Sequence, residues 1–267
     1  MHEISVVIPT YNREKHIKKS IESVLAQKAD HERFEIREII VVDDHSTDNT
    51  QEIIDSISDP RIKYIYQKEN GGPGAARNKG VDIAKYEWIA FHDSDDIWVS
   101  DKLLKQVTYI DEHPGCEMVC GSTKQTYNGQ TTIMVLPEEY NEVGFFATKN
   151  YVDAPTILIK KERFLSIGGF DVDLKALEDW DFGLRYADIY RIGFVNEILI
   201  EKTPLDGGVS SHVGNYFEAR CRIITKNREI LERHGCFEKA MEHLLIIADQ
   251  AGVLKETAAM LELYLTI

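Results

Sequence analysis

The sequence predicts an α/β fold in which helices flank a mostly parallel central sheet. Over residues 1–110, short stretches rich in Val and Ile alternate with stretches whose apolar residues recur at helical spacing. Such alternation favours parallel strands joined by right-handed crossovers. The chain has 267 residues, of which 43% are apolar, so it can bury a full core without disulfides or a structural metal.

The first part of the chain gives the clearest pattern of elements. In its first helix, Ile17, Ile21 and Val24 form the apolar face, and Ser46 or Thr47 is the expected cap of the second helix. The periodicity predicts strands over residues 3–9, 35–42, 61–67 and 87–91, and helices over residues 13–27, 48–57 and 74–85.

The second part of the chain is less regular. Residues 116–159 predict extra strands, some of them antiparallel, and a further strand is expected over 194–202. Residues 161–167 and 177–190 predict helices. Because the pattern turns helical after residue 212, we expect one domain over residues 1–212 and a helical C-terminal extension over residues 213–267.

Charge and cysteine content exclude several classes of protein. The formal net charge of -14 argues against a nucleic-acid groove, which needs clustered Lys and Arg. The acid excess serves either solubility alone or, in part, a metal or a proton transfer. No apolar run reaches the ~20 residues that span a bilayer, and no signal peptide is expected at the start. The cysteines form no C-x-x-C pair, so free thiols in a reducing cytosol are expected for Cys116, Cys120, Cys221 and Cys236.

Polar side chains follow all four strands predicted in the first part. The segments are residues 9–12, 43–46, 69–72 and 93–96, and two of them are strongly acidic. Ligands of such sheets bind beyond the carboxyl ends of the strands. A turn can use an Asp or Asn, but packing alone does not require four polar strand ends on one edge, which therefore indicate a ligand site.

Asp93 and Asp95 form a D-x-D motif directly after a buried strand. Acids would repel a diphosphate unless a hard divalent cation lay between them, and an all-oxygen site favours Mg²⁺ or Mn²⁺ over Zn²⁺. The motif alone is weak evidence. Asp96 or Ser100 has a simpler alternative role as the cap of the next helix.

The two preceding strand ends offer candidate nucleotide contacts. A carboxylate in the Asp43 and Asp44 pair can accept the imide N–H of a pyrimidine base, although a helix cap is the alternative. The glycines of residues 70–74 open a helix, whose N-terminus favours anions. Arg77 and Asn78 then face phosphate or base, or belong to an ordinary helix start. Neither a P-loop nor a dinucleotide motif is present in the sequence.

A second acidic cluster begins the helix expected over residues 177–190. Acids in a first turn gain ~0.3–1 kcal/mol from the helix dipole. The alternative is a general base that takes a proton from an attacking hydroxyl, with Glu178 and Asp179 as candidates. Trp180 either stacks on a sugar or packs in the core. His212 follows a glycine-rich loop and is a candidate additional metal ligand.

Taken together, these motifs resemble the inverting family 2 glycosyltransferases, which have the GT-A fold. The resemblance covers residues 3–210. It rests on residues 6–12, 41–48, 70–78, 93–96, 168–171 and 178–179, in order and at familiar spacing.

The resemblance implies donor-side roles within a nucleotide-binding half over residues 1–110. Asp44 would contact uracil or thymine. Asp93, with Ser94 beside it, would face the ribose or a metal-bound water, and Asp95 would bind Mn²⁺ or Mg²⁺ directly. The base pocket would be lined by Pro9, Thr10 and Tyr11, and the nucleotide-side helix begins at Arg77 and Asn78.

The resemblance also implies an acceptor half over residues 111–212. Asp179 would be the catalytic base, with Glu178 and Trp180 on the acceptor side. The implied reaction moves a sugar from a nucleoside-diphosphate sugar, mostly a UDP-sugar in this family, to a hydroxyl of a saccharide or lipid-linked saccharide. Polysaccharide or glycolipid synthesis in the cytoplasm, at the inner face of the membrane, is the expected setting. For the C-terminal helices, acceptor docking, a homodimer contact and peripheral membrane association stay open.

One departure from the family pattern lies after the last predicted strand. Lys202 stands where the family often has an Arg, and the family's His has no match in residues 201–206. A sugar nucleotidyltransferase is the first rival, but it would need a basic glycine-rich loop that residues 9–13 lack. An inactive nucleotide-sugar-binding or scaffold protein is the second rival, although a decayed site should lose acids that this chain keeps.

Overall fold

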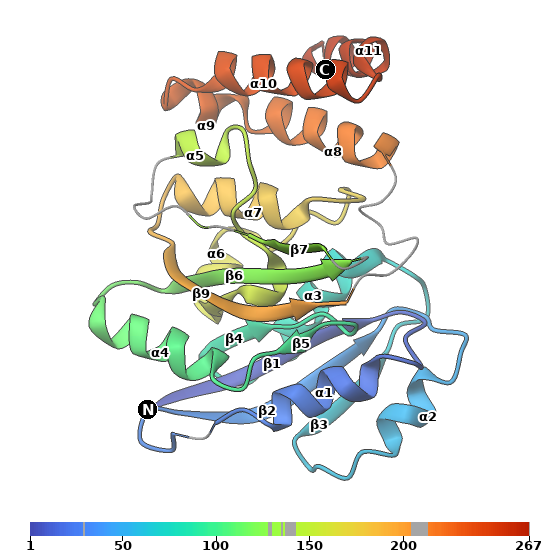
Figure 1. Ribbon diagram of the computed structural model, residues 1–267, viewed down its shortest axis with the longest axis vertical. Coiled ribbons are helices and arrows are strands. Elements are labelled where there is room, and N and C mark those ends of the chain that lie inside the picture. The colour runs from blue at the N-terminus through green and yellow to red at the C-terminus, as the bar shows by residue number, and fades with distance from the viewer. Residues whose placement is uncertain (29, 128–129, 135, 137–142, 204–212, 267) are drawn as a thin grey trace.

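The computed structural model is a mixed α/β structure in which helices cover a curled central sheet (Figure 1). It describes the chain except for residues 29, 128–129, 135, 137–142, 204–212 and 267. Candidate metal ligand His212 therefore lies outside the described residues.

The N-terminal half is a parallel sheet in the strand order β3-β2-β1-β4. The predicted strands and helices of this half are confirmed, with ends that shift by a few residues. Its strands are β1 (His2–Thr10), β2 (Phe34–Asp43), β3 (Ile62–Tyr66) and β4 (Trp88–Phe91), and its helices are α1 (Ile17–Leu25), α2 (Thr50–Asp55) and α3 (Gly72–Ile83).

The sheet continues beyond β4 with strands of both directions. Antiparallel β8 (Leu158–Lys160) joins β4 to β6 (Met118–Tyr127), which pairs in parallel with β9 (Gly193–Lys202). β5 (Ile97–Trp98) pairs with β9 at the edge opposite β3, and β7 (Gln130–Ile133) pairs with β6 outside this strand order; both pairings are antiparallel. Among the described strands, six run one way and three the other, which confirms a mostly parallel sheet.

Short helices connect the strands of this second half. The helices predicted over residues 161–167 and 177–190 are confirmed, the second being shorter at both ends. The elements are α4 (Lys102–Glu112), α5 (Val143–Phe146), the 3-10 helix η1 (Ala154–Thr156), α6 (Lys161–Ser166) and α7 (Glu178–Ala187).

The inner strands β1, β2 and β4 are buried on both faces, which explains their nearly continuous apolar sequences. Alternate residues of β1 point to opposite sides. Ile4, Val6 and Ile8 pack in the core that contains α1, whereas Val7 packs in the core that contains α3 and α7. This burial leaves the carboxyl ends of the strands as the place where polar residues gather.

The described residues after position 212 form four helices: α8 (Val213–Lys226), α9 (Arg228–Arg233), α10 (Phe237–Gln250) and α11 (Leu254–Leu265). They stack above α5 and α7 (Figure 1). Phe217, Leu231 and Leu244 are buried in the same core cluster as the α7 residues Phe182 and Leu184. The extension therefore shares a core with the helix that begins at Glu178.

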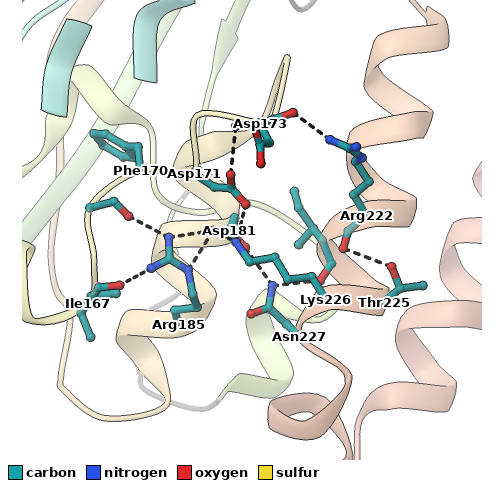
Figure 2. Close-up of polar contacts among 12 residues, drawn as sticks. Ile167, Phe170, Asp171, Asp173, Asp181, Arg185, Arg222, Thr225, Lys226 and Asn227 are labelled. Carbon is teal, nitrogen blue, oxygen red and sulfur yellow. Dashed lines mark hydrogen bonds and ion pairs between the residues drawn. The ribbon is translucent and has the colours of Figure 1, made fainter. Parts of the chain in front are cut away.

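A polar network also fastens the extension to α7, as Figure 2 shows. Asp181 is fully buried and accepts a hydrogen bond from Nδ2 of Asn227 at 2.9 Å. Its other oxygen pairs with Arg185 at 2.7 Å and with Lys226 at 3.2 Å, and Lys226 also binds Asp171. These contacts fix the C-terminal helices to the helix that carries the candidate base.

The structure also decides two further expectations, one about the cap of α2 and one about the cysteines. The prediction that Ser46 or Thr47 caps α2 is wrong. The helix begins at Thr50, and the backbone N–H of Thr50 donates to Oδ1 of Asp48 at 3.0 Å. The four cysteines are free thiols, as predicted. Among the described residues, no helix has the length and apolar character needed to cross a membrane.

Candidate active site

The carboxyl ends of β1 and β2 are joined at the expected base pocket. The N–H of Asp44 donates to the carbonyl of Thr10 at 2.8 Å. Pro9 and Thr10 are buried, while the ring of Tyr11 is exposed. Oγ1 of Thr10 is buried without a partner among the described residues, so its hydrogen-bonding capacity is unused at this edge.

Asp44 holds the glycine-rich loop that opens α3. Its Oδ1 accepts hydrogen bonds from the N–H of Gly71 at 2.8 Å and from Nε2 of Gln67 at 2.6 Å. Its Oδ2 accepts one from the N–H of Gly72 at 2.7 Å. A carboxylate oxygen has two acceptor positions, so Oδ2 keeps one that a base imide can use. Asp44 therefore holds the glycine-rich loop in place, and its free acceptor position is compatible with a contact to a base.

Arg77 links the two acidic clusters, a role that the sequence interpretation missed. One arm of its guanidinium lies 2.6 Å from Oδ1 of Asp93, and the other lies 2.6 Å from Oε1 of Glu178. The side chain is buried, so it does not present a free cation to a nucleotide. Burial disfavours the charge of Asp93, but Arg77 and Lys202 outweigh that effect and hold the pKa of Asp93 below its usual value.

Asn78 binds backbone rather than an open surface. Its Nδ2 donates to the carbonyl of Phe170 at 2.8 Å, and its Oδ1 accepts the N–H of Phe170 at 3.0 Å. Gly169 has a φ of 68°, and a Cβ there would lie 2.8 Å from Oδ1 of Asn78. The expectation that Asn78 faces the donor is revised, because its amide fixes the loop before α7 to α3.

The acids after β4 lie in different surroundings. Oδ2 of Asp95 pairs with Nε of Arg13 at 3.0 Å, and burial together with Asp93 raises its pKa. Asp96 is buried, and burial with Asp93 raises its pKa to about 8. The helix-cap role of Asp96 is wrong, since α4 begins at Lys102 after Asp101, and Oδ1 of Asp96 accepts the N–H of Thr203 at 3.2 Å. Ser100 does not cap α4 either, and Ser94 is buried between the acids.

Lys202 reaches this cluster from the end of β9. Its Nζ lies 2.7 Å from Oδ2 of Asp153. Burial lowers the pKa of Lys202, but Asp153, Asp96 and Asp93 outweigh burial and raise it overall. The residue that departs from the family pattern thus brings a positive charge to the acids after β4.

The residues present fit a divalent cation that arrives with a diphosphate. Among the residues that the structure describes, no group of three or more His, Cys, Asp or Glu could hold an ion by itself. Mg²⁺ is usually bound by one or two carboxylates together with substrate phosphates. Asp93 and Asp95 offer such a pair, because described cationic side chains contact only Oδ1 of the first and Oδ2 of the second.

Asp179 has the environment of a general base. Its Oδ1 accepts hydrogen bonds from Nδ2 of Asn150 at 2.9 Å and from the N–H of Trp180 at 2.8 Å. Its Oδ2 accepts the N–H of Ala154 at 3.2 Å. Burial, Glu178 and Asp153 raise its pKa to about 7, against lowering by Ala154 and Arg77. A carboxylate with a pKa near the working pH combines the right protonation state with useful basicity.

The neighbours of Asp179 take structural positions. Glu178 is nearly buried against Arg77. Trp180 is 1% exposed, and its Nε1 donates to the carbonyl of Phe146 at 2.6 Å. Packing therefore explains Trp180, and the expectation that its ring stacks on a sugar is not supported by this placement. Asn150 was missed because a single amide in a loop has no sequence pattern.

Comparison with known proteins gives a consistent result. A family model described as "Glycosyl transferase family 2" matches residues 5–164, more than half of the chain. An uncharacterized glycosyltransferase of Methanocaldococcus jannaschii is 32% identical over 205 residues, which are 74% of this chain and 69% of that protein. TuaG of Bacillus subtilis, a putative teichuronic acid biosynthesis glycosyltransferase, is 41% identical over 41% of this chain and 42% of its own length.

Solved structures show the same fold. TarS of S. aureus, residues 1–349 in complex with UDP-GlcNAc, matches with a TM-score of 0.69 and 26% identity over 83% of this chain and 65% of its own. A mannosyltransferase of Pyrobaculum calidifontis, in complex with GDP-Man and Mn²⁺, also has a TM-score of 0.69. It is 18% identical over 96% of this chain and 73% of its own, and it supports the GT-A-type fold alone. The chain spans 61% to 69% of the length of four matching relatives.

Proposed function

Because the chain belongs to glycosyl transferase family 2, we propose that it moves a sugar from a nucleoside-diphosphate sugar to a hydroxyl acceptor. The acceptor is a saccharide or a lipid-linked saccharide, and the anomeric configuration inverts. The setting proposed is polysaccharide or glycolipid synthesis in the cytoplasm, at the inner face of the membrane. The relationship to a putative teichuronic acid biosynthesis enzyme supports polysaccharide synthesis.

One observation carries the mechanism: Arg77 joins the donor-side acid Asp93 to Glu178, the residue before the candidate base. The guanidinium bridges residues from β4's end and from the first turn of α7 with two contacts of 2.6 Å. A sugar whose diphosphate lies at Asp93 would therefore have Asp179 close to its acceptor side. Transfer by direct attack needs this arrangement of a donor site beside a base.

In the proposed reaction, Asp179 accepts the proton of the acceptor hydroxyl while the oxygen of that hydroxyl bonds to the anomeric carbon. The bond between that carbon and the diphosphate oxygen breaks in the same step, and the electron pair leaves with the nucleoside diphosphate. Asn150 and Ala154 hold the carboxylate through hydrogen bonds at 2.9 and 3.2 Å. The step needs no covalent sugar–enzyme intermediate.

Asp95 would bind a Mn²⁺ or Mg²⁺ ion directly, and Asp93 would face the ribose or a water on that ion; when bound, the ion supplies Lewis-acid stabilisation of the developing diphosphate charge. Lys202 adds a positive charge near the same acids through its place beside Asp153. We propose UDP as the nucleotide, since TarS, at 26% identity, was solved with UDP-GlcNAc. Thr10 and Asp44 would contact its base.

A thermal-shift experiment tests this proposal. The protein is heated with UDP, dTDP and GDP, each with and without Mn²⁺. We expect stabilisation by UDP that depends on Mn²⁺, because a ligand that binds only the folded state raises its stability by mass action. Stabilisation by GDP or dTDP instead would correct the nucleotide. No shift with any of them would favour an inactive scaffold with this fold.

A further inference from the structure

A pocket of about 430 Å³ lies where the C-terminal helices meet the start of α7. Its volume is within the ~300–1,000 Å³ of small-molecule sites. The described lining includes two aromatic residues, Tyr216 of α8 and the buried Trp180 of α7. The polar lining includes Lys149, Asn150, Arg220 and His243. The extension thus builds one wall of a pocket beside the candidate base.

The described lining of this pocket has a charge opposite to that of the chain. Two positively charged side chains, Lys149 and Arg220, line it together with His243, whose pKa is lowered by burial and by the nearby Arg220, and none of the described lining residues is Asp or Glu. The chain as a whole has a formal net charge of -14. A concave site with clustered basic groups in an acidic protein favours an anionic ligand by simple attraction.

Arg220 is the strongest sign of a missing anion. It is 4% exposed, and its partners among the described residues are neutral. Its two terminal nitrogens donate to Oη of Tyr216 and to the carbonyl of Thr148, each at 2.7 Å, and the guanidinium lies 4.4 Å from the ring centre of Trp180. Its Nε is buried without a partner in the described part of the chain. A buried charge without a counter-ion is costly, so an anion bound here would be stabilised.

His243 repeats this signature on α10. Its Nδ1 is buried, again without a partner among the described residues. Two incompletely bonded side chains from different helices therefore line one pocket. Unsatisfied buried polar groups are rare in folded proteins and call for a ligand or water.

The pocket adjoins the candidate base. Asn150 lines the pocket and donates its Nδ2–H to Asp179 at 2.9 Å. Trp180, the residue directly after Asp179, lines the pocket as well, and its backbone N–H donates to the same carboxylate at 2.8 Å. A sugar seated in this pocket would therefore have its hydroxyls near Asp179.

We propose that this pocket binds the acceptor, and that the acceptor is an anionic saccharide whose phosphate or carboxylate group is held by Arg220, His243 and Lys149. The sugar ring would lie against Tyr216, with a hydroxyl toward Asp179. This inference rests on the proposed function and extends it from a hydroxyl acceptor to an anionic one. It also gives the C-terminal helices a direct part in acceptor recognition.

Calorimetric titration of the full chain at constant ionic strength tests the inference with three matched probes: glucose, glucuronate and glucose 6-phosphate. We expect at least one anionic hexose to bind about tenfold or more tightly than glucose, as a charge-assisted hydrogen bond provides. Preference for glucuronate alone identifies a carboxylate, and preference for glucose 6-phosphate alone identifies a phosphate. Equal binding of the three probes, or no binding of any, would overturn the inference.

Variants separate the pocket from general charge effects. Arg220→Gln should remove the preference for the anionic probe, and His243→Gln should weaken it. Because Arg220 is buried and its loss can impair folding, the exposed Lys149 gives an independent test. Lys149→Ala should weaken anion binding about two- to fivefold, in keeping with an exposed charge pair. Lys255→Ala removes the charge of another exposed lysine, which lies outside the described lining, and should leave binding of the probes unchanged. Equal effects of these two Lys variants, with no effect of His243→Gln, would contradict the inference.

The thermal-shift experiment on the same protein separates this inference from the proposed function. Nucleotide-dependent stabilisation without preference for an anionic hexose overturns the pocket assignment alone. Preference for an anionic hexose without stabilisation by any nucleotide removes the acceptor role, and it overturns both proposals together.

Discussion

Replacement of Arg77 by Met tests whether one buried cation holds the two acidic clusters together. In the native protein the guanidinium contacts Asp93 and Glu178, each at 2.6 Å, and its side chain is 6% exposed. Met keeps most of the aliphatic stem and fills much of the same space. The substitution therefore removes the charge and leaves two carboxylates facing each other.

The expected loss follows from the exposure of the two acids. Removing one partner of a buried ion pair costs about 3–5 kcal/mol, because the remaining charge stays buried and uncompensated. Glu178 has a side chain that is 11% exposed and should bear most of this cost. Asp93 is 25% exposed and can be partly solvated. We expect a total loss of about 3–5 kcal/mol, a large part of the ~5–15 kcal/mol typical of a folded protein.

Equilibrium unfolding in urea, followed by circular dichroism, measures this loss. Arg228→Met is the matched control, since Arg228 and its partner Glu232 have side chains that are 52% and 48% exposed. The control should lose no more than about 1 kcal/mol. A loss of less than about 1 kcal/mol in Arg77→Met, equal to that of the control, would refute the idea that this bridge supports the site.

Three further predictions follow from the site and its supports. Burial, Glu178 and Asp153 raise the pKa of Asp179 to about 7 despite Arg77, so the base is protonated below that pH. Initial rates should therefore fall about tenfold per pH unit on the acid side. In Asp179→Asn, transfer should fall by about 10²–10⁴-fold. This acid limb should vanish and the nucleotide-dependent thermal shift should remain; a retained limb would assign the base elsewhere. Asp95→Ala should lose the part of nucleotide stabilisation that depends on Mn²⁺, as judged by thermal shift, and an unchanged Mn²⁺ effect would rule Asp95 out as a ligand. Asn227→Ala should cost about 1–3 kcal/mol in urea unfolding, because it removes a donor from the buried carboxylate of Asp181. Thr225→Val, which loses only local backbone contacts, is its control and should cost less.

Most strands of the N-terminal half could be predicted because burial on both faces leaves a strong signal. Val6, Val7 and Ile8 are all fully buried, and such uninterrupted apolar residues are typical of a parallel strand inside a protein. The polar strand ends could be predicted because Asp and Asn side chains directly follow these apolar stretches in the sequence.

Helix starts were predicted less well where several suitable residues are adjacent. Residues 43–50 contain Asp, Ser, Thr and Asn side chains, and each type can bind a free N–H at a helix start. Local pattern does not decide between them. Only the path of the chain gives Asp48 the N–H of Thr50 and leaves Asp96 to bind Thr203.

The role of Arg77 could not be predicted because it depends on distant parts of the chain. Asp93 and Glu178 lie 16 and 101 residues from it, and neither spacing produces a pattern in the sequence. The basic pocket could not be predicted either, because its side chains come from three separate segments of the chain, at Lys149, Arg220 and His243. The roles of the candidate base and the metal ligand stay predictions that rest on resemblance and on these surroundings.

A donor-hydrolysis screen tests the central claim most directly. The protein is incubated with UDP-, GDP- and dTDP-sugars in the presence of Mn²⁺, and the release of nucleoside diphosphate is measured beside Asp179→Asn and Asp95→Ala. We predict release from one UDP-sugar by the wild-type chain and a marked loss in both variants. Release that is equal in all three proteins, or none from any donor, would contradict the assignment of a metal-dependent transferase to this site.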